Sequence, residues 1–137
     1  MSKRPGDIGS RVIETVMVVE PDVLVRMTVA DYLRECGYRV VEAITGEEAL
    51  SILGAGVKVE TILSAVRLQG AIDGFALAQR VREGFGGVEV ILTTGYAMTA
   101  RKAGELCDQG SRKRPYHPDL IVDRLKLLFE KHRPKPS

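Results

Sequence analysis

The stretch TILSAVRLQGAIDG (residues 61–74) predicts a buried strand, a loop and the start of a helix. Its first five residues form a short apolar run, which suits a strand of a parallel sheet covered on both faces. Asp73 followed by Gly74 is typical of a helix N-cap. The strand is expected to end at Ala65, whose methyl group is neither a nucleophile nor a metal ligand.

Strand and helix patterns alternate on both sides of this stretch. Further strands are predicted at residues 15–19, 38–43 and 88–93, and helices at 23–36, 46–54, 74–85, 98–107 and 118–130. Such alternation implies crossover connections and a mostly parallel sheet with helices on both faces. We therefore predict an α/β, flavodoxin-like doubly wound fold. No Gly-rich phosphate loop follows the first strand, so nucleotide binding has little support.

Composition limits the chain to one domain in a soluble class. Its 137 residues carry a net charge of +2, which is too small to argue nucleic-acid binding. No apolar run is long enough to span a membrane, and a cytoplasmic location is expected. Cys36 and Cys107 are interpreted as small buried apolar groups in a reducing compartment. The predicted domain covers residues 12–130, with tails at 1–11 and 131–137.

Four motifs in register carry a family resemblance. They are VMVVEPDVLVR (16–26), GYRVVEAITGEEAL (37–50), VILTTGYA (90–97) and RKRPYHPDL (112–120). Together with residues 61–74 they resemble the receiver domain of response regulators over residues 14–129. The resemblance implies a CheY-like fold with five parallel strands in the order 2-1-3-4-5 and five helices. In that family the third strand ends in an aspartate that accepts a phosphoryl group from a histidine kinase.

The resemblance assigns a family role to eight positions near the carboxyl ends of the strands. The first acid is Glu20, Pro21 stands at a metal-ligating aspartate, Asp22 follows, Ala65 replaces the phosphoacceptor, Thr94 is the hydroxyl residue, Gly95 gives access, Arg114 stands where the family has lysine, and Ser111 stands at the switch aromatic. Nucleophile, one metal ligand, lysine and aromatic are thus missing. Phosphotransfer at this site is excluded, the chain is not expected to be an enzyme, and neither Mg²⁺ nor another cofactor is expected.

Structural roles compete with functional ones at several of these positions. Glu20 and Asp22 suit the start of a helix, where acidic side chains are favoured, as much as a retained polar pocket. Thr94 is interpreted as a strand-end residue. Asp73 is expected to cap a helix, with phosphate acceptance as the less favoured role.

The basic residues near the predicted fifth strand have two interpretations. Arg112 and Lys113 suit an exposed sheet edge, where charges prevent edge-to-edge pairing. Alternatively they form an interaction face with Arg101 and Lys102, since the resemblance places the output surface there. Arg114 is predicted to enter the emptied pocket and pair with Glu20 or Asp22; the alternative is an edge cation that points to solvent and contributes little.

These observations favour a stand-alone pseudo-receiver of a bacterial two-component-type system. It would bind a protein partner, either a histidine kinase or a regulator, or a second copy of itself, without phosphorylation. A phosphoreceiver using Asp73 or Asp22 is the alternative. Binding of an anionic ligand or a nucleic acid by the basic cluster ranks last. No metal site is expected, because neither histidine has a partner at metal-ligand spacing.

Overall fold

A parallel sheet of four strands forms the centre of the protein in a computed structural model that describes residues 13–110 and 113–132. The strands are β1 (Thr15–Val19), β2 (Arg39–Ala43), β3 (Thr61–Ala65) and β4 (Glu89–Thr93), in the order β2-β1-β3-β4. Every residue of β1 is buried, because this strand lies between two others and under helices on both faces. The α/β, CheY-like flavodoxin fold is confirmed, with the predicted strand order as far as β4.

Five helices follow the predicted segments closely. They are α1 (Val23–Glu35), α2 (Gly46–Gly54), α3 (Gly74–Gly84), α4 (Tyr96–Gln109) and α5 (Asp119–His132). Two predicted N-caps are confirmed: the Asp73 carboxylate accepts from the Ala76 N–H at 2.8 Å, and the Thr45 hydroxyl accepts from the Glu48 N–H at 3.1 Å. Within the described ranges, no helix combines the length and apolarity that crossing a bilayer requires. Residues 1–12 and 133–137, which hold most of the predicted tails, lie outside those ranges.

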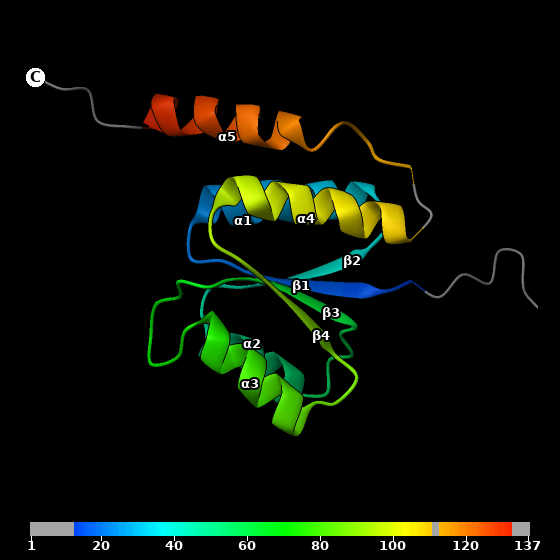
Figure 1. Cartoon of the computed structure of the whole chain (residues 1–137), viewed down its shortest axis with the longest axis vertical. Coiled ribbons are helices and arrows are strands. Elements are labelled where there is room, and N and C mark those ends of the chain that lie inside the picture. Colours follow the sequence, from blue (N-terminus) through cyan, green and yellow to red (C-terminus); the bar gives the residue numbers. More distant parts are fainter. Residues whose placement is uncertain (1–12, 111–112, 133–137) are drawn as a thin grey trace, which may run out of the picture.

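One face of the sheet is covered by α2 and α3 (Figure 1). Their apolar faces pack on the strands around four side chains that are fully or almost fully buried: Met17, Ile62, Leu77 and Val81. The predicted apolar stripe of α3 therefore forms part of the core, as its four-residue spacing indicated.

The opposite face is covered by α1 and α4, and α5 forms a third layer outside them (Figure 1). This arrangement differs from the one the predicted fold implies. In the order 2-1-3-4-5, the crossovers after β3 and β4 step in the same direction, so right-handed connections place α3 and α4 on one face. Here α4 crosses to the face of α1. Of the predicted fifth strand, Ser111 and Arg112 lie outside the described residues, and residues 113–118 form no strand.

Two links hold α4 against α1 and β2. Cys36, just after α1, is joined by a disulfide to Cys107 of α4, with their Cα atoms 5.7 Å apart. The interpretation of these cysteines as separate thiols was wrong, although both are buried as predicted. Their helical spacings placed each on an apolar face but could not show that the two faces meet. The buried Tyr38 hydroxyl also donates a hydrogen bond to the carbonyl of Leu106 in α4.

The outer helix α5 is anchored through the same layer. Ile121 and Leu125 are completely buried in the core that α1 and α4 share. Pro118, just before α5, lies so close to Gly104 of α4 that a side chain there would collide with its ring. The Tyr32 hydroxyl of α1 donates to the Tyr116 carbonyl at 3.2 Å. The segment that follows α4, including α5, therefore packs on α1 and α4 and not on the sheet.

We predict that replacing both cysteines, as Cys36→Ser with Cys107→Ser, lowers the free energy of unfolding by about 2–4 kcal/mol. The bridge spans 71 residues of sequence, and closing so long a loop removes much entropy from the unfolded chain. Guanidinium denaturation of the oxidised protein and of the double variant measures the loss. Adding a dithiol reductant should lower the free energy of unfolding of the wild type and leave that of the double variant unchanged. Equal stabilities in oxidising buffer would contradict the bond.

A second prediction concerns Gly74 at the start of α3. A methyl group there would lie 2.5 Å from the Ala65 carbonyl oxygen and 2.8 Å from the Val66 Cα. Gly74→Ala should therefore destabilise the protein by about 1–3 kcal/mol, because backbone must move. Gly84→Ala, in the same helix, is the control: nothing lies within 4 Å of the added methyl, and helix propensity favours alanine. Similar unfolding midpoints for the two variants would show that the β3–α3 loop is not closely packed.

Candidate functional site

A cavity of about 470 Å³ opens at the carboxyl ends of β1, β3 and β4. The strand register produces it: Val19 pairs with Ser64, and Ala65 pairs with Thr93, so the residues that follow these strands lie at one edge. Six residues assigned from the sequence line the cavity together, namely Glu20, Pro21, Asp22, Ala65, Thr94 and Gly95. The structure thus brings these positions into one site, as Figure 1 shows for the ends of their strands.

The cavity also has apolar walls that the sequence analysis did not assign. Val25 of α1 and Val66 after β3 contribute aliphatic surface. Tyr96, the first residue of α4, and Phe129, in the last turn of α5, contribute two rings in edge-to-face contact, with centroids 5.5 Å apart. Phe129 reaches the site only because α5 lies outside α4. No local signal in the sequence indicates that position.

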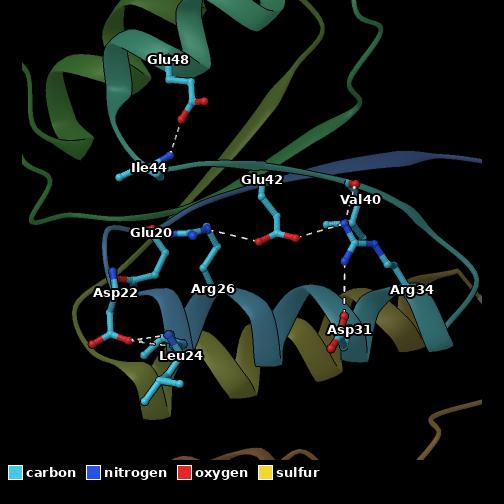
Figure 2. Close-up of polar contacts among 11 residues, drawn as sticks. Glu20, Asp22, Leu24, Arg26, Asp31, Arg34, Val40, Glu42, Ile44 and Glu48 are labelled. Carbon is cyan, nitrogen blue, oxygen red and sulfur yellow. Dashed lines mark hydrogen bonds and ion pairs between the residues drawn. The ribbon is translucent and has the colours of Figure 1, made fainter.

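The two acids of the cavity are organised by the start of α1 (Figure 2). Asp22 is the N-cap: its Oδ1 accepts the N–H groups of Leu24 at 2.9 Å and Val25 at 3.1 Å. The Glu20 Oε2 accepts the N–H of Asp22 at 2.9 Å. Both interpretations of these acids therefore hold, because they stabilise the helix start and also line the cavity.

Arg26 lies beside these acids without pairing with their carboxylates. Its Nη1 donates to the Glu20 backbone carbonyl at 2.9 Å, and its Nε donates to the Glu42 carboxylate at 3.2 Å. Burial raises the pKa of the Glu20 carboxyl, since a charged group loses hydration there; the Asp22 N–H opposes the shift.

The hydroxyl residues at the end of β4 divide into two roles. Thr93 is buried, and its Oγ1 lies 2.7 Å from the Thr99 Oγ1, which ties β4 to α4. Thr94 is exposed at the cavity rim, and its hydroxyl contacts the Met98 sulfur at 3.7 Å. Thr94 therefore presents a hydroxyl to the cavity, whereas Thr93 positions the helix.

The donor set of the cavity does not fit Mg²⁺. A Mg²⁺ ion requires near-octahedral oxygen coordination. Pro21 and Ala65 supply no side-chain oxygen, and Asp22 already uses one oxygen for two N–H bonds. Within residues 13–110 and 113–132, no three His, Cys, Asp or Glu residues are grouped as metal ligands.

The predicted pairing of Arg114 with Glu20 or Asp22 was wrong. Its guanidinium instead forms a bidentate pair with Asp108, at 2.9 and 2.7 Å, near the end of α4. This pair raises the pKa of Arg114. The prediction assumed a fifth strand ending at the cavity, and no such strand carries Arg114 there. Ser111, the predicted switch position, lies outside the described residues.

The predicted basic face is of mixed charge where the structure describes it. Arg101 and Lys113 are exposed, while Lys102 pairs with Glu105 at 3.2 Å. Arg101 lines a second cavity, of about 620 Å³, together with Arg114, His117 and three acids: Glu105, Asp119 and Asp123. Arg112 lies outside the described residues. Acids thus alternate with the cations on this face.

Comparison of the sequence with known protein families shows to which family the chain belongs. The family model of the response regulator receiver domain matches residues 16–124. The chain belongs to the response regulator receiver domain family. The match extends from β1 into α5 and so includes every strand of the sheet. This receiver domain is therefore part of two-component signalling.

Two curated relatives match this chain over only part of their own length. The chain is 25% identical over 118 residues to the uncharacterized transcriptional regulatory protein YbdJ of Bacillus subtilis (strain 168), covering 85% of this chain and 51% of that protein. It is 31% identical over 120 residues to the sensor kinase CckA of Brucella abortus (strain 2308), covering 85% of this chain and 13% of that kinase. The chain therefore spans about half the length of YbdJ and a much smaller part of CckA.

Solved structures agree on the fold. The receiver domain of the hybrid histidine kinase CckA is 28% identical, with a TM-score of 0.53 over 68% of this chain and 98% of that chain. MaeR bound to beryllium trifluoride is 25% identical, with a TM-score of 0.54 over 61% and 68% of the two chains. CheY4 of Vibrio cholerae, at 20% identity, shares the fold with a TM-score of 0.56 over 85% and 98%.

The raised pKa of Glu20 predicts a pH-dependent effect of Glu20→Gln. A raised pKa means that the folded state binds the proton more tightly, so charging Glu20 costs stability as pH rises above the unfolded value of 4.5. Glutamine avoids this cost and can still accept the Asp22 N–H. The variant should gain stability relative to the wild type at about pH 7 and lose that gain near pH 4. Urea denaturation at both values measures it; a gain that is the same at both would contradict the burial argument.

Proposed function

We propose that this receiver domain is a pseudo-receiver that signals by binding a protein, without accepting a phosphoryl group. The observation that carries the proposal is Ala65, which lines the cavity together with Glu20 and Thr94 at the position where the family has its phosphoacceptor. Phosphoryl transfer needs a nucleophile there and a cation to neutralise charge. A methyl group and an incomplete donor set supply neither. The domain is accordingly proposed to carry out no catalytic step.

The contacts of Asp22 and Asp73 argue against displaced phosphorylation. Each carboxylate caps a helix through Oδ1: Asp22 caps α1, and Asp73 caps α3. Phosphorylating either one would disrupt its cap, at a cost of about 0.5–2 kcal/mol. The pseudo-receiver therefore fits the contacts better than the phosphoreceiver does.

The proposed binding surface is the α4–α5 face, which we define as Arg101, Lys102, Lys113 and the mixed cavity around Arg114. Its cations and acids are exposed and alternate, which suits a partner with complementary charges of both signs. The proposed partner is a histidine kinase or a regulator of the same pathway, or a second copy of this chain. The proposed location is the cytoplasm, a reducing compartment in which the Cys36–Cys107 bond can open.

Phosphorylation provides the first test. Incubation with acetyl phosphate and Mg²⁺ should add no phosphoryl group to the wild type in intact-protein mass spectrometry. Ala65→Asp should also remain unmodified, because Pro21 still withholds a metal ligand. A receiver domain that has an aspartate at the position of Ala65 is the positive control for the phosphodonor. A phosphoryl group on any aspartate of the wild type would refute the proposal.

Charge reversal tests the surface. Arg101→Glu combined with Lys113→Glu should reduce partner recovery in affinity capture by about tenfold or more, because like charges then face each other. Lys58→Glu combined with Arg82→Glu is the matched control, since both side chains are exposed, neither lines the mixed cavity, and α3, which carries Arg82, covers the opposite face of the sheet. Sedimentation of the purified protein detects self-association separately. Equal recovery by both double variants would exclude the α4–α5 face.

A further inference from the structure

The cavity at the strand ends has the size of a small-molecule site. At about 470 Å³ it falls within the range of about 300–1,000 Å³ typical of ligand pockets. Its walls are mainly apolar, with Val25, Val66, Tyr96 and Phe129 around the Ala65 methyl group. Such walls do not suit a hydrated ion. They suit an organic molecule with an apolar body.

The polar groups of the cavity are mainly acidic. Asp22 Oδ2 and Glu20 Oε1 accept no hydrogen bond from any residue that the structure describes, while their other oxygens hold the start of α1. The charge of Arg26 partly offsets that of Glu20 and opposes the rise that burial causes in its pKa, but the Arg26 guanidinium donates its hydrogen bonds to Glu42 and to a backbone carbonyl. Figure 2 shows this division, with Arg26 directed toward Glu42. Arg67 lines the cavity as an exposed residue. Two carboxylates against one solvated cation leave the site negative.

Two aromatic rings line the cavity beside the acids, and this combination favours binding of a cation. Tyr96 and Phe129 line the same cavity as the two acids. Ring faces attract ammonium groups, and recognition of organic ammonium ions commonly combines aromatic walls with carboxylates. Glu20 pays a desolvation penalty when charged, which a bound cation would offset.

We propose that this cavity binds a small organic ammonium ion, that is, a protonated primary amine attached to an aromatic group. Its ammonium pairs with the free carboxylate oxygens of Glu20 and Asp22, and its ring lies among the apolar walls. The methyl group of Ala65 matters here, since an aspartate would fill part of the apolar space and add a third charge. The two acids repel an organic carboxylate more strongly than the uncapped N-terminus of α4 attracts it, because each acid carries a full charge and a helix end about half of one.

The inference goes beyond the proposed function and does not depend on it. The two sites share no residue: the ligand cavity includes Tyr96 and Phe129, whereas the protein-binding surface consists of Arg101, Lys102, Lys113 and the cavity around Arg114. If the partner-capture experiment fails, the amine-binding proposal still stands. If the amine titration fails, the proposed protein-binding surface still stands.

The test uses 2-phenylethylamine, with 2-phenylethanol and phenylacetate as neutral and anionic probes of similar shape. Titration into ¹⁵N-labelled protein should give saturable shifts at the amides of Ala65 and Tyr96 for the amine. The alcohol should bind about tenfold or more weakly, and phenylacetate should not bind at concentrations up to about 10 mM. Absence of saturation by the amine, equal affinities for amine and carboxylate, or shifts confined to other residues would overturn the proposal.

Two variants test separately the charge of the two acids and the free volume of the cavity. Glu20→Gln with Asp22→Asn removes both charges and keeps the helix cap, because asparagine caps as well as aspartate. It should lower the affinity for the amine to that for the alcohol. The control, Asp31→Asn with Glu35→Gln, makes the same charge change at exposed positions of α1 outside the cavity and should leave the affinity unchanged. Ala65→Leu should abolish binding of both probes, provided its circular dichroism matches the wild type. An unchanged amine affinity in the doubly neutralised variant would refute the ion pair.

Discussion

The packing of α4 on α1 is the constraint on which the second half of this protein depends. A helix that follows β4 has two faces of the sheet available. The face of α3 leads on to a fifth strand, and the face of α1 does not. Here the Cys36–Cys107 bond and the Tyr38–Leu106 hydrogen bond hold α4 on the α1 face. With α4 there, α5 can bury Ile121 and Leu125 only from outside.

The same packing determines the shape of the site. A fifth strand would deliver its final residues to the cavity beside β4. Instead the cavity is completed by Tyr96 from α4 and Phe129 from α5, and Arg114 pairs with Asp108 far along α4. The site thus combines the strand ends of a receiver domain with apolar walls. Ala65 and Pro21 place no side-chain oxygen at the cavity, so they add no polar group that would conflict with those walls.

The sequence predicts what is local. The apolar run 15–19 and the caps at Thr45 and Asp73 depend on near neighbours, so the four strands and the start of α2 and α3 were predicted correctly. The convergence of Glu20, Ala65 and Thr94 was predictable too, because parallel strands end at one edge. The face of the sheet on which α4 packs could not be predicted, because the apolar stripe of α4 fits either face. The errors at Cys107 and Arg114 both follow from that choice.

Nuclear Overhauser contacts between methyl groups test the position of α4 most directly. Selective methyl labelling of Val, Leu, Ile and Ala reports which helix lies against Ala103 and Leu106. The account predicts cross-peaks from these residues to Val29 and Leu33 of α1, all members of one buried cluster. Cross-peaks from α4 to Leu77 or Val81 of α3, with none to α1, would contradict it.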